Sequence, residues 1–507
     1  MKRLWLELAL VFVSLVAIGG LATAYVNNSG WTLYYGDAEA HLDIARRIID
    51  SRKPGYDQIG TVWLPLPHLL MLPLVRIDAL WRSGLAGAIP SSACFVCAGL
   101  FLYAALRQAA SSSAVALASL ALLVLNPNLL YLQATPMTEA AFLAAFMALL
   151  YFTVLFHETQ SFAAVIGAGF ASVAASLARY EGWFVIPFVA AYFLIVGRKH
   201  RFWAALLFSV IAALAPLYWL GHNWWIYSNP LEFYNGPYSA MAIYRRALAQ
   251  NMAPYRGDHD WRAAAFYYLT AVQLCAGWVA LAIGIAGLAG IFLRRLFWPV
   301  LLTSIPPLFY IWSMHSGGTP IFVPKLWPFS YYNTRYAIAA LPLIAIAGGG
   351  LVLLPPQRWR PWIAAVIVIA AVTPWLIRPQ PSDWITWKES QINSITRRAW
   401  MNAAAPLLAG PYHSGQGIIT SFGDLTGILR EADISLKEAL YDGDEPAWMA
   451  AIARPDLFLH EEWAVAVAGD SVATAIQRAS LKTGPRYHLV QTVKVKGAPV
   501  IEIYKRD

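Results

Sequence analysis

Long apolar runs alternate with short polar gaps along most of the chain. Runs of about 17–25 residues are long enough to cross a bilayer as helices. The runs of this kind are residues 5–25, 86–106, 114–132, 138–156, 162–178, 182–197, 202–220, 264–292, 297–313, 336–354 and 361–377. The pattern predicts an all-α polytopic membrane protein with about eleven transmembrane helices. The first run is too long for a typical signal peptide, so we expect an uncleaved first span.

Positive charges gather in several of the gaps. The clusters are Lys2 with Arg3, Arg107, residues 198–201, Arg294 with Arg295, and Arg358 with Arg360. With eleven spans every cluster falls on one side, which the positive-inside rule makes cytoplasmic. The odd count then places the C-terminus outside the cytoplasm, and we expect a bacterial inner membrane.

The pattern changes after about residue 380, where apolar content falls and charge rises. Strand, helix and hairpin patterns follow at residues 418–420, 445–453, 472–480, 488–495 and 499–504. We therefore expect a membrane domain at residues 1–380 and a small extracytoplasmic α/β domain at 381–507. This tail shows neither a nucleotide-binding glycine pattern nor a catalytic constellation.

The composition is typical of a membrane protein and argues against a nucleic-acid partner. The 507 residues are 59% hydrophobic and 13% charged, whereas soluble domains carry about 25% charged residues. The net charge of +9 comes from short clusters between apolar runs, so the expected partner is a lipid bilayer and not nucleic acid. Cys94 and Cys97 form a CxxC inside an apolar run, which favours buried helix thiols over metal or redox chemistry.

The first loop, residues 26–85, carries the most informative chemistry. Residues 35–50 have an amphipathic helical pattern in which Asp37 and His41 share a face with three apolar residues. A carboxylate on an apolar face is costly unless it is paired, and one poised there can take a proton from a hydroxyl. Alternatively, Asp37 is only the helix N-cap. Glu39 falls on the opposite face, where a solvated first-turn acid is favoured by the helix dipole.

Loose motifs follow this helix in a recognisable order. A Pro-rich turn at residues 60–70 contains Trp63 and His68. Later segments read Thr-Pro-Met-Thr-Glu at residues 135–139, Ala-Arg-Tyr-Glu-Gly at 178–182 and Tyr-Asn-Thr-Arg-Tyr-Ala at 332–337. Together with the acid that opens the first-loop helix, they resemble the GT-C superfamily of membrane glycosyltransferases. The closer relatives are protein O-mannosyltransferases and the aminoarabinose transferases that modify lipid A, and the resemblance covers about residues 1–380.

The resemblance implies an inverting glycosyltransferase at the outer face of the membrane. It would move a sugar from a polyprenyl-phosphate donor to a hydroxyl of a glycan, lipid or protein, with Asp37 as the general base. Arg335 is the first candidate to stabilise the departing phosphate, while Arg179 either helps or pairs with Glu181 or Glu139 as a structural lock. The expected substrate-binding residues are Glu39, His41, Trp63, His68, Glu139, Arg179, Glu181, Tyr238, Lys325, Tyr332 and Arg335.

No metal or other cofactor is expected, although an Asp-x-Glu can hold a divalent cation in the oligosaccharyltransferase branch. Many relatives have adjacent acids, whereas Ala38 separates Asp37 from Glu39, and residues two apart on a helix point about 200° apart. Residues 229–238 precede a basic helix that should end near Arg256, and this segment fits either a lid or an interfacial helix.

Two other functions stay open. One is a lipid or glycan transporter or flippase, although internal repeats and mid-bilayer charges, which are typical of transporters, are not seen in the sequence. The other is an assembly or sensor protein whose tail binds a partner. The sequence reveals neither the sugar nor the acceptor.

Overall fold

The computed structural model describes residues 2–421, 423, 425–480 and 484–507. The chain divides into two compact units, and each unit is built from three separate segments of the sequence. The helical unit comprises Met1–Trp31, Thr61–Pro67 and Ala88–Glu389, and the mixed unit comprises Thr32–Gly60, His68–Gly87 and Ser390–Asp507. Parts of the first loop therefore belong to the same unit as the tail.

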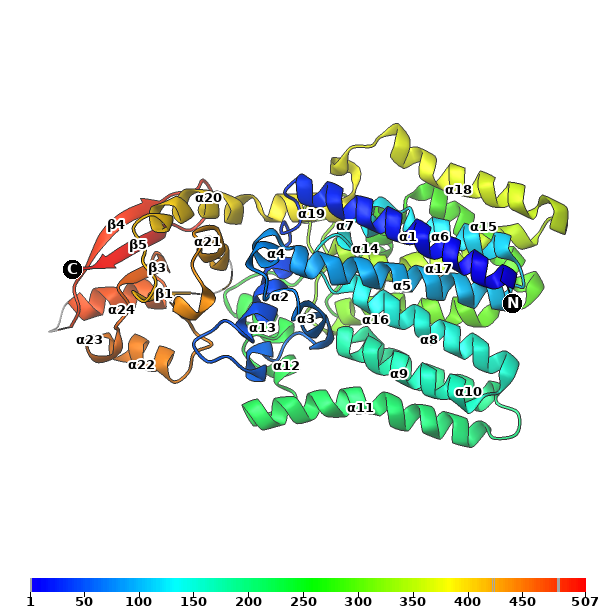
Figure 1. Ribbon diagram of the computed structural model, residues 1–507, viewed down its shortest axis with the longest axis horizontal. Helices are drawn as coiled ribbons and strands as arrows, with labels where there is room; N and C mark the ends of the chain where they lie inside the picture. The colour runs from blue at the N-terminus through cyan, green and yellow to red at the C-terminus, as the bar shows by residue number, and fades with distance from the viewer. Residues whose placement is uncertain (1, 422, 424, 481–483) are drawn as a thin grey trace. The chain divides into compact units, whose positions relative to one another are not determined.

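The helical unit is a bundle whose long helices run side by side (Figure 1). Its principal helices are α1 (Lys2–Asn28), α5 (Leu85–Ala109), α6 (Ser113–Val124), α7 (Pro127–Leu132), α8 (Glu139–Thr159), α9 (Phe162–Ala178), α10 (Glu181–Val196), α11 (Arg201–Tyr227), α12 (Glu232–Asn235), α13 (Ala240–Ala249), α14 (Trp261–Ala276), α15 (Trp278–Arg294), α16 (Phe297–Ser316), η2 (Thr334–Ala340), α17 (Leu341–Gly349), η3 (Gly350–Leu353), α18 (Arg360–Ile377) and α19 (Ile385–Asn393). The predicted polytopic helical architecture is confirmed.

The number of spans stays a prediction. Seven helices of the described residues are long and apolar enough to cross a membrane, or eight if α14 and α15 form one broken span. The other predicted spans, α6, α9 and α10, are shorter apolar helices. In Figure 1 the start of α1 and the turn between α10 and α11 lie at the same end of the bundle, as the charge clusters predicted.

Two predicted continuous runs are broken in the structure. Gly277 has φ +80° and separates α14 from α15, which are bent by 106°. Glycine permits this break because L side chains rarely adopt that backbone conformation. Asn126 caps α7 by accepting from two backbone N–H groups, and Pro127 cannot continue the preceding helix. The predicted spans at 264–292 and 114–132 are therefore not single continuous helices, and whether each crosses the membrane stays a prediction.

Glycines set a close helix approach within the bundle. Gly284, Gly287 and Gly290 recur every three residues on α15, against α17 and η3. A Cβ on Gly287 would lie 1.9 Å from the carbonyl oxygen of Ala347. Small residues of this kind allow backbones to approach closely, which is how helices gain packing energy in lipid.

The substitution Gly287→Ala is expected to destabilise the protein by about 1–3 kcal/mol, because overpacking forces the backbones apart. The matched control is Gly221→Ala in α11, where the added Cβ meets no atom within 4 Å. That control should be neutral or gain up to about 1 kcal/mol in helix propensity. Thermal unfolding in detergent compares the two, and equal stabilities would contradict the close approach.

The mixed unit contains a small sheet covered by helices. Its elements are α2 (Gly36–Arg47), η1 (Tyr56–Ile59), α4 (Asp78–Ser83), α20 (Ile395–Ala409), α21 (Thr426–Glu431), α22 (Ala447–Ala453), α23 (Pro455–Phe458), α24 (Ser471–Ser480), β1 (Ile418–Thr420), β2 (Ala439–Leu440), β3 (Trp463–Val467), β4 (Tyr487–Val493) and β5 (Ile501–Arg506), with α3 (Leu66–Met71) at the border of both units. The strand order is β2-β1-β3-β5-β4, with β1 parallel to β2 and β3, and β5 antiparallel to β3 and β4.

The sheet confirms most of the predicted tail. Strand β1, helices α22 and α24 and the β4–β5 hairpin lie where the sequence placed them. The prediction missed β3, a five-residue strand at the middle of the sheet. A short continuous apolar run cannot be assigned to strand or helix from its periodicity.

The first loop and the tail share one hydrophobic core. Leu42 and Ala45 of α2 belong to the same buried cluster as Trp81 of α4 and Trp400 and Ala404 of α20. Fully burying a leucine side chain such as that of Leu42 stabilises a fold by about 1.5–3 kcal/mol. The position of α2 is therefore tied to the folding of the tail.

Candidate active site

Helix α2 presents the acid that the sequence singled out. The helix begins at Gly36, after Tyr35, which is the N-cap residue and makes no side-chain cap. Asp37 is thus the second residue of the helix, and the alternative that it is only the N-cap is wrong. Asp37 and Glu39 both lie in the first turn, where the helix dipole favours negative charge.

Glu39 is buried, which overturns the predicted solvated position. Its carboxylate oxygens lie 2.8 Å from Nε of Arg397 and 3.0 Å from Nη2 of Arg430. Only 3% of Glu39 is exposed, so these two cations compensate a charge that would otherwise be costly to bury. Helical periodicity could not reveal this, because the arginines come from α20 and α21 at the far end of the chain.

Asp43, one turn beyond Glu39, is also buried. Its Oδ1 accepts a hydrogen bond from Nε1 of Trp81 at 3.3 Å. Burial, followed by the nearby Glu39 carboxylate, raises the pKa of Asp43 to about 6, although Arg430 and Thr426 act in the opposite sense. The fold therefore favours the protonated form of this group.

The substitution Asp43→Asn is expected to raise the free energy of unfolding at pH 7 by up to about 3 kcal/mol. The pKa of Asp43 is higher in the folded state than its ordinary value of 3.8, so the folded state binds the proton more tightly. Stability then falls as the pH rises between about 4 and 6, and Asn removes that loss. Unfolding curves of both proteins across this pH range measure the difference. A constant difference between them would contradict the prediction.

Asp37 differs from the other acids of α2 in its exposure. Of the three acids in this helix, only Asp37 is not buried. His41, one turn further, is buried, and its Nδ1 lies 2.9 Å from Nε2 of the buried His68. The helix therefore buries Glu39, His41 and Asp43 in the mixed unit, whereas Asp37 is partly exposed.

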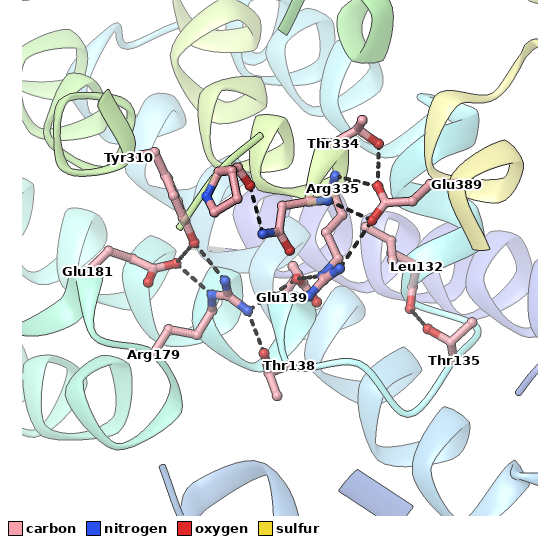
Figure 2. A network of polar contacts seen from close by, with 12 residues as sticks. Leu132, Thr135, Thr138, Glu139, Arg179, Glu181, Tyr310, Thr334, Arg335 and Glu389 are labelled. Atoms are coloured by element: carbon pink, nitrogen blue, oxygen red, sulfur yellow. Dashed lines mark hydrogen bonds and ion pairs between the residues drawn. The ribbon is translucent and has the colours of Figure 1, made fainter. Parts of the chain in front are cut away.

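A second group of predicted residues meets inside the helical unit, around Arg179 (Figure 2). Arg179 lies between the end of α9 and the start of α10. Its guanidinium donates to Oε1 of Glu181 at 2.6 Å and to the hydroxyl of Tyr310 at 2.7 Å. It also donates to Oγ1 of Thr138 at 2.6 Å and to Oε1 of Glu139 at 3.1 Å. The predicted pairing of Arg179 with Glu181 and Glu139 is confirmed.

Arg335 extends this network at the start of η2 (Figure 2). Its Nη1 donates to Oε1 of Glu389 at 3.2 Å, and its Nε lies 3.6 Å from Oε1 of Glu139. Glu389 also accepts hydrogen bonds from the hydroxyl of Thr334 and the backbone N–H of Asn333. Burial raises the pKa of Glu389, while Arg335 opposes that change. Glu139 thus lies between two guanidinium groups.

Sequence reasoning missed two members of this network. Tyr310 lies within the apolar helix α16. The only hint in the sequence was a polar phenol close to Pro306 and Pro307 in a largely apolar run. Glu389 lies in α19 and carries no motif that would have marked it. The network borders a narrow cavity lined by Glu139, Phe142, Leu143, Arg179, Glu181, Tyr310, Arg335, Tyr336, Ile338 and Ala339.

The other predicted residues of the helical unit lie outside that cavity lining. Trp63 is partly buried, and Tyr238, Lys325 and Tyr332 are exposed. The basic helix expected to end near Arg256 is α13, which already ends at Ala249.

The two cysteines of the CxxC lie in a helix, as predicted, but they are not both buried. Cys94 and Cys97 both lie in α5. Cys97 is exposed and Cys94 is partly buried, so the prediction of buried thiols is wrong for Cys97. Hydrophobic periodicity in a fully apolar run does not tell which face of the helix meets other helices.

A two-carboxylate metal site does not fit the first-loop helix. The Glu39 carboxylate is engaged by Arg397 and Arg430, and these cations would repel a metal ion. Among the residues that the structure describes, no group of three or more His, Cys, Asp or Glu side chains is placed to hold a metal.

Known proteins share both part of the sequence and the fold. A family model described as dolichyl-phosphate-mannose-protein mannosyltransferase matches residues 80–222. The crystal structure of ArnT from Cupriavidus metallidurans bound to undecaprenyl phosphate matches with a TM-score of 0.54 and 12% identity, over 95% of this chain and 97% of that one. The chain therefore shares its fold with ArnT, and part of its sequence matches the mannosyltransferase family model. The resemblance drawn from its motifs to GT-C glycosyltransferases is thus confirmed in the fold and in part of the sequence, and with its long apolar helices the chain is an integral membrane protein.

A second match is to the oligosaccharyltransferase of Archaeoglobus fulgidus in its apo form. It has a TM-score of 0.48 and 12% identity, over 90% of this chain and 69% of that one. No curated protein sequence matches this chain.

Proposed function

We propose that this protein is an inverting glycosyltransferase that uses a polyprenyl-phosphate sugar. The reaction takes place on the extracytoplasmic face of a bacterial inner membrane, where the first loop and the tail both lie. A lipid-phosphate donor is supported by the GT-C fold and by the fold-related ArnT, whose structure contains undecaprenyl phosphate. The observation that carries the proposal is Asp37, the partly exposed acid on a helix whose other acids are buried.

Asp37 acts as the general base in this proposal. Its carboxylate takes the proton of the acceptor hydroxyl, and the hydroxyl oxygen attacks the anomeric carbon of the sugar. The bond between that carbon and the phosphate oxygen breaks, and polyprenyl phosphate leaves with its electron pair. Attack from the face opposite the leaving group inverts the anomeric centre. A positioned base of this kind contributes about 10²–10⁴-fold to the rate.

Arg335 is proposed to stabilise the leaving phosphate. Its guanidinium pairs with Glu389, a carboxyl whose pKa is raised by burial. The guanidinium of Arg335 also lies 3.6 Å from Glu139, and charge-assisted hydrogen bonds from a guanidinium to a phosphate oxygen are strong. Arg179 has the separate task of holding Glu139 and Glu181, since its donors are engaged by four polar groups.

The exposed aromatic and basic residues are proposed to contact the donor or acceptor. Trp63, Tyr238 and Tyr332 offer rings that suit a sugar face or the membrane interface. Lys325 offers a second cation for an anionic group on either substrate. The buried residues Glu39, His41 and His68 contact other residues of the mixed unit, so a direct substrate contact is least favoured for them.

A donor panel tests the proposal directly. Purified protein in lipid vesicles is incubated with radiolabelled polyprenyl-phosphate sugars, and consumption of each donor is followed. We expect one donor to be consumed and its label to appear on an acceptor. Label that crosses the bilayer still attached to its lipid would instead indicate a flippase. If no donor in a complete panel is consumed, the glycosyltransferase proposal is wrong.

A further inference from the structure

The segment that leads into α2 is held by arginines of the tail. Nη2 of Arg397 donates to the carbonyl oxygens of Leu33 and Tyr34 at 2.9 and 2.8 Å. Nη1 of Arg398 donates to the hydroxyl of Tyr34 at 3.1 Å, and its guanidinium lies 4.1 Å from the centre of that ring. Helix α20 therefore fixes the residues immediately before α2.

Arginines of the tail also hold the first turn of α2. Arg397 also pairs with the carboxylate of Glu39, as does Arg430 of α21. A Cβ on Gly427 would lie only 2.5 Å from Oε1 of Glu39, so the backbone of α21 closely approaches this carboxylate. Nη1 of Arg430 further donates to the carbonyl oxygen of Arg82 at 2.7 Å, which fixes its orientation.

The residues after α2 are tied to the tail as well. Asp50 accepts hydrogen bonds from the hydroxyl of Ser435 and from the backbone N–H of Lys437, the latter at 3.3 Å. It also accepts a hydrogen bond from Nε of Arg46 at 2.8 Å. Because both ends of the helix are held, α2 cannot slide or tilt without breaking buried polar contacts.

These contacts flank the proposed general base. Tyr34 precedes Asp37 by three residues, and Glu39 follows it by two. Breaking a buried ion pair by removing one partner is strongly unfavourable, which gives α2 one defined position. A displacement of about 1 Å in a catalytic group can lower a rate about 10²-fold.

We propose that Arg397 and Arg430 are positioning residues that set the place of Asp37 by clamping Glu39. The proposal rests on the function proposed above, and it makes the tail a working part of the catalytic unit. The arginines touch neither donor nor acceptor in it. They act through the helix that carries the base.

The test compares Arg430→Gln, Arg430→Lys and Glu39→Gln in the full-length protein in nanodiscs. Arg454→Gln is the matched control, because Arg454 pairs with Asp456 at an exposed place in the tail. We measure kcat and KM for sugar transfer, and deuterium exchange of the peptide that contains α2. We expect both Gln variants to lose about ten- to a hundredfold in kcat, with donor KM changed less than twofold and faster exchange in α2. The kcat of Arg430→Lys should lie between the values of the two Gln variants and wild type. The control Arg454→Gln should have the wild-type kcat and the wild-type exchange in α2.

The double variant Arg430→Gln with Glu39→Gln separates positioning from general destabilisation. If Arg430 acts through Glu39, the double variant loses no more kcat than the worse single variant. Additive losses in kcat, or wild-type exchange in α2 for all three substitutions, would overturn the proposal. If Arg430→Gln does not fold, Arg430→Lys is compared with Arg454→Gln instead. A lower kcat and faster exchange in α2 for Arg430→Lys support the positioning role, and wild-type values for both overturn it. A wild-type protein that transfers no sugar refutes the proposed function, whereas exchange in α2 still shows whether the tail holds the helix.

Discussion

Replacing Asp37 by Asn is expected to lower kcat for sugar transfer by about 10²–10⁴-fold while the protein keeps its fold. Asn has the shape of Asp but cannot take the proton of an acceptor hydroxyl. The side chain of Asp37 is partly exposed, so the substitution should cost little stability. Single-turnover transfer from the donor identified in the panel measures the loss.

Two variants of the same loop control this experiment. Asp57→Asn removes an exposed acid in η1, and transfer should stay at the wild-type level. Glu39→Gln removes a buried, ion-paired acid, so its loss of rate should come with faster exchange in α2. Transfer at the wild-type rate in Asp37→Asn would remove this residue from the mechanism.

Replacing Arg179 by Gln is expected to destabilise the helical unit by about 3–5 kcal/mol. The guanidinium compensates the buried carboxylates of Glu139 and Glu181 and also binds Thr138 and Tyr310. Without it, two acids stay buried with less positive charge beside them, which is costly. Thermal unfolding in detergent measures the change.

An exposed arginine provides the matched control for this second prediction. Arg245→Gln in α13 removes the same charge from an exposed position. Its free energy of unfolding should stay within about 0.5 kcal/mol of wild type. The double variant Arg179→Gln with Glu181→Gln should regain part of the lost stability, because it also removes a carboxylate that the single variant leaves uncompensated. A melting temperature for Arg179→Gln equal to that of the control would contradict the role of the network.

The architecture of this protein was largely predictable from its sequence. A bilayer forces each spanning segment to satisfy its own backbone hydrogen bonds, so apolar runs report helices regardless of their partners. Strand patterns and turn residues located β1 and the β4–β5 hairpin, and helical patterns located α22 and α24, for a similarly local reason. The order of motifs around Asp37, Arg179 and Arg335 was also enough to indicate the resemblance to GT-C glycosyltransferases, whose fold the structure shares.

The sequence did not show which charged groups meet. Periodicity gave Glu39 a solvated face, yet the folded chain places Arg397 and Arg430 against it. Glu389 carried no local signal, although it pairs with Arg335 in the buried network. A local pattern reports which side of a helix is apolar, whereas the partner of a buried charge is decided by the path of the whole chain. Hydrophobic periodicity therefore determined the helices of this protein, and only the tertiary structure decided which acids are buried in ion pairs and which one stays accessible.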